Sequence, residues 1–183
     1  MTGWEELIKA CEKCQKCVLA KTRTNVVIGR GNINAPVMFV GEGPGEQEDK
    51  QGLPFVGAAG KLLDLLLDAM MFKKEDYYIC NIVKCRPPGN RVPTDEEAES
   101  CLPYLRQQVR LTRPKIIVCL GSTAARFIID RSARITNIHG QWFERKGFSI
   151  MPTFHPAALL RDESKKALMW EDVKKVKQRL NAI

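Results

Sequence analysis

The stretch KIIVCLGSTAARFIID, residues 115–130, joins a short apolar run to a helical pattern through one glycine. Residues 115–121 are rich in β-branched side chains and nearly continuous in apolarity, which is typical of a strand covered on both faces of a parallel sheet. Helical periodicity follows Gly121. A strand that runs directly into a helix is the repeating unit of α/β folds, so this stretch predicts that fold class.

The same alternation of strand and helix recurs along the chain. Further apolar runs predict strands, of which the last is the weakest, at residues 37–42, 77–84 and 149–156. Helical patterns occupy residues 58–70, 94–111 and 164–183, and Thr94 with Glu97 is expected to cap the second of these. Together they predict a three-layer α/β/α sandwich around a central four-stranded parallel sheet with right-handed crossovers. Because the chain has no repeat and no long linker, residues 1–183 are expected to form a single domain.

Composition limits the setting in which the protein works. Lys and Arg exceed Asp and Glu by 29 − 21 = 8, which favours a polyanionic partner such as nucleic acid, although a solvated basic surface gives the same balance. Residues 1–9 lack the apolar run of a signal peptide, and no run is long enough to span a membrane. We therefore expect a cytoplasmic protein with no membrane partner.

Seven cysteines suggest a disulfide framework, a metal site or buried small hydrophobes. Disulfides are disfavoured in the cytosol, and an odd number of cysteines cannot pair fully. Cys14 and Cys17 form a C-x-x-C pair with Cys11 at the same interval, and Cys85 and Cys101 are separated by fifteen residues. This spacing favours metal ligands, without a second tight pair. Two others lie inside predicted strands and are expected to be buried hydrophobes: Cys80 and Cys119.

Polar or glycine-bearing positions mark the ends of the predicted strands: Glu42 in a glycine-rich turn, Asn81, the Gly121–Ser122 turn, and His155. Ligands of open α/β sheets bind outside the carboxyl edge, so these residues predict one cleft. Glycines in the first turn allow close backbone approach to a ligand, although a lone glycine-rich loop is more often only a tight turn. Of the two histidines, His155 is the preferred functional candidate, because it ends a strand whereas His139 lies in an ordinary turn context. A core histidine with its hydrogen bonds satisfied is an equal alternative for His155.

Several motifs, taken together, resemble the iron–sulfur uracil-DNA glycosylases called family 4. They are CEKCQKCVLAKTRTNVVIGRG (11–31), GEGPGEQEDKQGLPFVGAAGKLL (41–63), NIVKCRPPGNRVPT (81–94), CLGSTAA (119–125) and FHPAALLR (154–161). The resemblance implies a [4Fe–4S] cluster with a structural role, held by Cys14, Cys17, Cys85 and Cys101. Cys11 is then an extra cysteine just upstream.

The resemblance also implies a DNA repair enzyme of prokaryotic, nucleoid-associated type. Such an enzyme flips deoxyuridine out of single- or double-stranded DNA and hydrolyses its N-glycosidic bond, which releases uracil and leaves an abasic site. The chain is then expected to act as a monomer, and a replication sliding clamp is a candidate partner. A different class remains as the alternative: a non-catalytic iron–sulfur module for nucleic-acid binding or electron transfer on the same fold.

If the resemblance to family 4 holds, uracil is recognised through its pattern of hydrogen-bond donors and acceptors. Uracil offers an acceptor at O4 beside a donor at N3. The Asn81 carboxamide supplies the matching donor and acceptor, whereas cytosine presents the reverse pattern. By resemblance, Phe55 stacks on the flipped ring and Glu48 crowds its C5 edge, where thymine carries a methyl group. Gly43 and Gly45 are expected to bring backbone amides to the base.

Bond cleavage places negative charge on the departing uracil, so a donor aimed at O2 stabilises the transition state. By resemblance, His155 fits this role. Glu42 is the candidate that positions the attacking water, with Asn90 as a weaker helper. The alternative for Glu42 is that it contributes only its backbone amide. Some relatives carry aspartate at the position of Gly43, and family 4 most often has alanine there. The residues expected to contact DNA are Leu159 as the inserted wedge, Arg161 at a phosphate, and Ser122; the two adjacent leucines at 159 and 160 also fit a helix core.

Overall fold

A computed structural model describes residues 3–183 and contains a six-stranded sheet of order β1-β3-β2-β4-β6-β5. The strands are β1 (Arg30–Gly31), β2 (Val37–Gly41), β3 (Tyr77–Asn81), β4 (Ile116–Leu120), β5 (Phe143–Arg145) and β6 (Phe148–Thr153). The four central strands are mutually parallel, and β1 and β5 pair antiparallel at the two edges. The α/β class is confirmed. The sheet is nevertheless mixed, because two edge strands, too short to leave an apolar run, extend the expected four.

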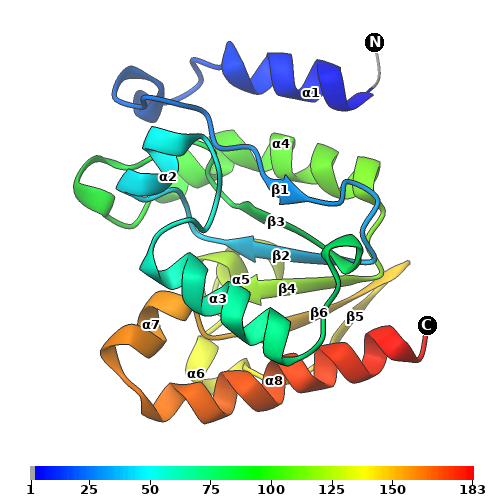
Figure 1. Cartoon of the computed structure of the whole chain (residues 1–183). Helices are drawn as coiled ribbons and strands as arrows, with labels where there is room; N and C mark the ends of the chain where they lie inside the picture. The colour runs from blue at the N-terminus through cyan, green and yellow to red at the C-terminus, as the bar shows by residue number, and fades with distance from the viewer. Residues whose placement is uncertain (1–2) are drawn as a thin grey trace.

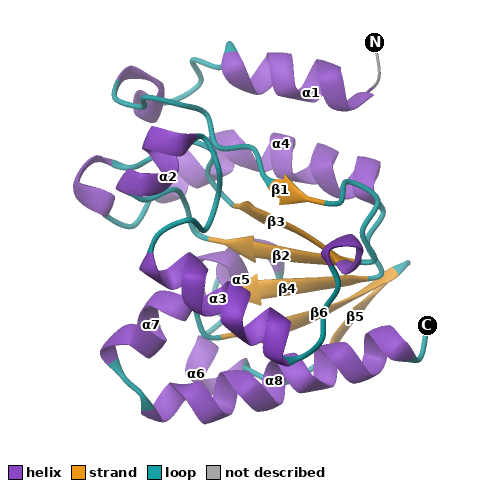
Figure 2. Ribbon diagram, in the orientation of Figure 1, coloured by secondary structure: helices purple, strands orange, loops and turns teal. Residues whose placement is uncertain are grey.

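Helices cover both faces of this sheet (Figure 2). Their bounds are α1 (Gly3–Glu12), α2 (Glu46–Gln51), α3 (Ala58–Ala69), α4 (Asp95–Thr112), α5 (Ser122–Ile128), α6 (Ile135–Ile138), α7 (Pro156–Arg161) and α8 (Ser164–Asn181). Side chains alternate along each strand, so Val37 and Phe39 pack against α3 and α8, whereas Met38 and Val40 pack against α4 and α5. Both faces of β2 and β4 are therefore dry, as their continuous apolarity predicted. Within residues 3–183, no helix is long and apolar enough to cross a membrane.

Local chemistry explains where two of the helices begin. Thr94 Oγ1 accepts the Glu97 N–H at 3.2 Å, and the Glu97 carboxylate accepts the Thr94 N–H at 2.8 Å, which confirms the expected cap of α4. Helix α2 was not expected, because its residues were interpreted as part of a glycine-rich turn. It begins after Gly45, whose N–H donates to the Glu48 carboxylate at 3.1 Å. Short helices such as α2, α6 and α7 are too brief to leave a periodic signal.

The first helix packs on α4 through Leu7, Cys11 and Tyr104. This contact brings the chain that follows α1, including Cys14, against the loop after β3 and the start of α4 (Figure 1). The amino-terminal segment is therefore part of the folded core and carries its cysteines to a fixed place.

The carboxyl ends of the four parallel strands lie along one edge of the sheet (Figure 1). Gly41 pairs with Asn81 across β2 and β3, and Leu120 pairs with Thr153 across β4 and β6. The turns that follow these residues consequently meet at this edge, as expected for the ligand side of an open α/β sheet.

Candidate active site

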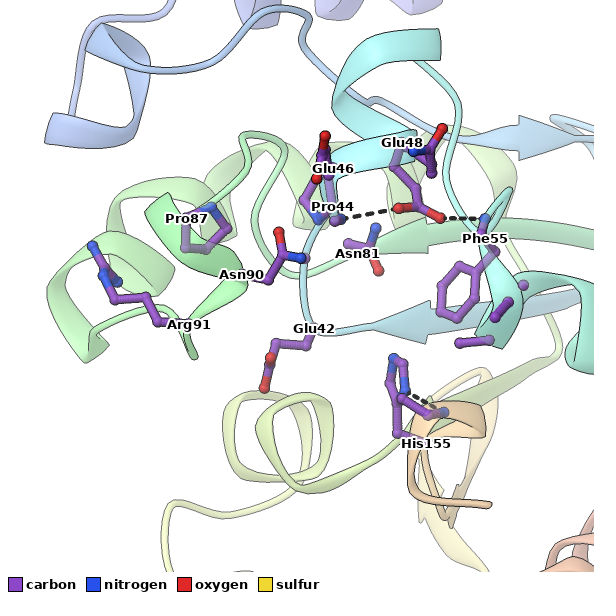
Figure 3. Close-up of a pocket in the computed structure, with 18 residues that line it drawn as sticks. Glu42, Pro44, Glu46, Glu48, Phe55, Asn81, Pro87, Asn90, Arg91 and His155 are labelled. Atoms are coloured by element: carbon purple, nitrogen blue, oxygen red, sulfur yellow. Dashed lines mark hydrogen bonds between the residues drawn. The ribbon is translucent and has the colours of Figure 1, made fainter. Parts of the chain in front are cut away.

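A cavity of about 450 Å³ opens at the carboxyl edge of the sheet (Figure 3). Its walls come from the turn after β2, the loop before α3, the end of β3, the loop before α4, and the start of α7. The sequence-predicted residues that line it are Glu42, Gly43, Gly45, Glu48, Phe55, Asn81, Asn90 and His155. The structure thus brings together residues more than one hundred positions apart in the chain.

Asn81 carries an unsatisfied acceptor at this cavity. The residue is 1% exposed, and its side-chain Oδ1 is buried without a hydrogen-bond partner. A Cβ atom at Gly41 would lie 2.5 Å from this oxygen, so glycine is required at the neighbouring strand end. Because an unpaired buried acceptor costs about 1 to 3 kcal/mol, the carboxamide is arranged for a ligand that donates a hydrogen bond.

Phe55 presents an aromatic ring from a constrained loop. Its φ of 55° lies in the left-handed region, which is costly for a bulky side chain. Arg30 restrains the loop by donating to the carbonyl oxygens of Pro54 at 2.9 Å and Phe55 at 3.3 Å. The ring stacks against His155 with centroids 5.5 Å apart. The aromatic platform is therefore held in place before any ligand arrives.

Glu48 ties the two walls of the cavity together, a role that sequence reasoning missed. Its Oε1 accepts the N–H groups of Val56 at 2.9 Å and Gly57 at 2.8 Å, and Oε2 accepts the Gly45 N–H at 3.1 Å. Figure 3 shows the carboxylate between the turn at Pro44 and the loop at Phe55. Both oxygens are thus engaged with backbone, so the side chain links the loops as well as lining the cavity.

His155 is held as a neutral imidazole. Its Nδ1 accepts the Ala157 N–H at 3.1 Å at the start of α7, which leaves the proton on Nε2. The pKa of His155 is lowered from 6.5 to about 4, chiefly by burial and to a smaller extent by the Arg161 cation, against the opposing effect of the Glu48 carboxylate. The ring is therefore an uncharged donor at neutral pH.

Glu42 and Asn90 lie on the opposite side of the cavity from Phe55 and are both engaged by neighbours. Thr123 Oγ1 donates to Glu42 Oε2 at 2.5 Å, and in Figure 3 the Glu42 carboxylate points away from Asn81. Asn90 Oδ1 accepts from Arg86 Nε at 2.7 Å. Each therefore has only part of its side chain available for a ligand or water.

Three residues predicted to contact DNA lie outside the cavity lining. Ser122 is exposed at the first position of α5, and Arg161 is exposed at the last position of α7. Leu159 is 4% exposed and packs in the core with α3 and α8. This burial favours the helix-core alternative for Leu159 over an inserted wedge, because a wedge must reach into solvent. Its neighbour Leu160 is 54% exposed.

Comparisons with known proteins agree with this geometry. A family model described as the uracil DNA glycosylase superfamily matches residues 28–177. The type-4 uracil-DNA glycosylase of Thermotoga maritima is 48% identical over 172 residues, covering 91% of this chain and 88% of that protein. That of Archaeoglobus fulgidus is 42% identical over 184 residues, covering 96% and 92%. This chain belongs to the type-4 uracil-DNA glycosylases. The family, the α/β class and the enzyme class expected from the sequence are confirmed, and the non-catalytic alternative is not favoured.

A type-5 uracil-DNA glycosylase, from Pyrobaculum aerophilum, is more distant, with 32% identity over 146 residues that cover 70% of this chain and 64% of that protein. In this type-4 chain, the packing around position 43 favours glycine. A Cβ atom at Gly43 would lie 2.6 Å from Val83 Cγ2, and Val83 is 1% exposed. A side chain at position 43 therefore requires the buried valine to move.

A second, smaller cavity of about 20 Å³ in this type-4 chain is lined by four cysteines: Cys14, Cys17, Cys85 and Cys101. Two donors point at their sulfurs, since Arg23 Nη1 lies 3.3 Å from Cys85 Sγ and the Lys84 N–H lies 3.4 Å from Cys101 Sγ. No group of three or more His, Cys, Asp or Glu within residues 3–183 has single-ion geometry. Four thiols around one space, with N–H donors at two of the sulfurs, are a ligand set that fits an iron–sulfur cluster.

The other cysteines differ in their surroundings. Cys80 and Cys119 are fully buried in the sheet, as expected, and burial raises the pKa of both. Cys11 is 2% exposed between α1 and α4, and burial raises its pKa to about 12. Its contacts with Leu7 and Tyr104 place it in the packing of α1, beside the four-cysteine cavity.

Proposed function

We propose that residues 1–183 act as one catalytic domain that excises uracil from DNA, with the base held in the 450 Å³ cavity. The observation that carries the proposal is the unpaired, buried Oδ1 of Asn81 in the wall of that cavity. Membership of the type-4 family supports the reaction class, and the buried acceptor supports the base.

Asn81 matches the edge of uracil that distinguishes it from cytosine. Oδ1 accepts from N3–H, and the side-chain NH2 donates to O4. Cytosine presents an acceptor at N3 and an amino group at C4, so both contacts fail. Two unpaired buried groups at about 1 to 3 kcal/mol each are sufficient for strong discrimination. Phe55 stacks on the ring and, with its loop already fixed, loses little freedom when the base enters.

Cleavage moves the electron pair of the glycosidic bond onto the uracil ring. The Nε2–H of neutral His155 donates to O2 and stabilises the charge that develops there, a kind of contact worth about 3 to 4 kcal/mol. Glu42, held by Thr123 through one oxygen, uses Oε1 to orient the water that adds to the sugar carbon. Asn90 assists through its amide nitrogen, because Arg86 already occupies its oxygen.

The DNA strand crosses the mouth of the cavity beside α5 and α7. Leu160, half exposed and next to the buried Leu159, is the side chain placed to fill the space left by the flipped nucleotide. Arg161 and Ser122 are exposed on these two helices and are proposed to contact phosphates.

The four-cysteine cavity is proposed to hold a [4Fe–4S] cluster. When bound, the cluster supplies a covalent cross-link between the segment after α1, the loop after β3 and helix α4. Excision of uracil transfers no electron, so the role proposed for the group is structural. Cys11, outside the lining of that cavity, is proposed to contribute packing alone.

The proposal is tested with matched oligonucleotides that carry uracil, cytosine or thymine at one position, followed by alkaline cleavage of abasic sites. The parent is expected to cleave only the uracil substrate. Asn81→Ala and His155→Ala are each expected to lose about 10²- to 10³-fold in kcat/KM, the first mainly through KM and the second mainly through kcat. Asn34→Ala, which removes an exposed asparagine before β2, is the control and should match the parent. An inactive parent with its iron intact would refute the proposed function.

A further inference from the structure

Lys84 is a buried lysine that lines the four-cysteine cavity and contacts a residue of the larger cavity. The residue is 2% exposed and lines the cavity of the four cysteines. Its Nζ donates to the backbone oxygen of Asn81 at 2.5 Å, and Asn81 lines the larger cavity. The short segment 81–85 therefore touches both sites, with the lysine side chain bent back between them.

The ammonium of Lys84 has no carboxylate partner within residues 3–183, where none of the ion pairs includes it. One carbonyl oxygen does not offset the desolvation of a cation, which costs several kcal/mol. Buried charges in proteins are usually paired with a charge of opposite sign. Burial raises the pKa values of three nearby thiols, and the charge of Lys84 opposes the rise at each of them: Cys11, Cys80 and Cys101.

We propose that Lys84 is the counter-cation of the cysteine-bound cluster and a positioning residue for Asn81. The inference rests on the function proposed above, because it takes the larger cavity as the uracil site and the four cysteines as cluster ligands. Cysteine ligands of iron are thiolates, so the loaded site carries negative charge that a buried ammonium offsets. The same ammonium holds the carbonyl of Asn81, and with it the backbone from which the uracil-reading carboxamide extends.

The backbone of this segment is anchored independently of the lysine side chain. The N–H groups of Ile82 and Val83 donate to the oxygens of Gly41 at 2.9 Å and Glu42 at 3.1 Å, and Val27 N–H donates to Lys84 O at 2.8 Å. A variant at position 84 is therefore expected to keep the chain path. Replacement by an uncharged side chain removes the charge beside the cluster and the donor to the Asn81 carbonyl oxygen.

The test compares Lys84→Met, which keeps the length of the side chain, with Lys84→Arg, which keeps the charge. Lys13→Met is the matched control, because Lys13 is next to Cys14 but exposed to water. Two quantities are measured on iron-loaded protein: the rate of iron loss to excess chelator, followed as absorbance near about 400 nm, and KM and kcat for a uracil-containing oligonucleotide.

Lys84→Met is expected to lose iron about tenfold faster, the usual effect of removing a group that supports metal ligands. Its KM is expected to rise about tenfold with kcat nearly unchanged, because Asn81 binds the base in both the ground state and the transition state. Lys84→Arg is expected to recover much of both losses, and Lys13→Met to match the parent. If Lys84→Met cannot be loaded whereas Lys84→Arg can, the requirement for charge is established.

Iron loss and KM at parental values in Lys84→Met would overturn the inference. Faster iron loss with a parental KM would reject the link to Asn81, and equal damage in Lys84→Met and Lys84→Arg would show that shape rather than charge matters. These outcomes differ from failure of the proposed function: a parent without excision activity rejects that function, while the iron-loss comparison still decides whether Lys84 is the counter-cation.

Discussion

Replacement of Glu48 by glutamine tests whether its carboxylate joins the two walls of the uracil cavity. Glutamine keeps one oxygen, which can still accept the N–H groups of Val56 and Gly57. Its amide nitrogen then faces the N–H of Gly45, where the parent has an acceptor at 3.1 Å. In the variant, the side-chain NH2 of glutamine faces the N–H of Gly45. Because both groups are donors, the part-buried Gly45 N–H is left without an acceptor.

An unpaired N–H of this kind costs about 1 to 3 kcal/mol. For a chain of this length each kcal/mol lowers Tm by about 2 to 4 °C, so Glu48→Gln is expected to melt about 2 to 12 °C below the parent. The control is Glu46→Gln on the same helix. Glu46 is half exposed and pairs with Lys50, an interaction worth less than about 0.5 kcal/mol.

The assay is thermal unfolding of iron-loaded protein at one pH, combined with KM for the uracil oligonucleotide. A looser loop around Phe55 is expected to raise KM in Glu48→Gln. Glu46 also lines the cavity, so Glu46→Gln is the control for Tm, and Asn34→Ala is the control for KM. Melting of Glu48→Gln together with the parent and with Glu46→Gln would refute the structural link. The Glu48 carboxylate would then line the cavity without linking the two loops.

Further predictions concern the histidine, the two leucines and the cysteines. The pKa of about 4 for His155 predicts an excision rate that is constant from pH 8 to about pH 5, whereas a fall centred near 6.5 would contradict it. Because the unfolded histidine binds its proton near 6.5 and the folded one only near 4, stability should fall by up to about 3 kcal/mol as pH drops across that interval. Leu160→Ala should weaken excision from duplex DNA more than from single strands, at unchanged Tm. Leu159→Ala should instead lose about 2 to 5 kcal/mol of stability in denaturant titrations. The reverse pattern would assign the role of wedge to Leu159. Cys85→Ser should reduce bound iron, measured by colorimetric assay, whereas Cys119→Ala should retain it, and equal iron in both would argue against the ligand set.

The sequence predicts the parallel core and the edge where the site lies, because both depend on local signals. Apolar runs such as residues 115–121 indicate buried strands, and polar residues at their ends, such as Asn81 and His155, meet once the strands are parallel. The cap formed by Thr94 and Glu97 is likewise local. These features require no knowledge of which loops touch.

Other features depend on contacts between distant segments and leave no local pattern. A helix of six residues does not reveal which of two adjacent leucines faces the core, so Leu159 and Leu160 could not be assigned. The three N–H partners of Glu48 come from two loops whose approach is set by the sheet. In the sequence, Lys84 resembles any basic residue of a polar motif, and its burial beside the four cysteines is evident only in the folded structure.

The most direct test of the uracil cavity is a crystal structure of the iron-loaded protein with uracil bound after excision. Asn81 Oδ1 is predicted to lie within about 3.2 Å of N3 and its side-chain nitrogen at a similar distance from O4, with His155 Nε2 directed at O2 and Phe55 against the ring face. A uracil ring bound elsewhere, or bound in the cavity with Asn81 Oδ1 still unpaired, would contradict the proposed mode of recognition.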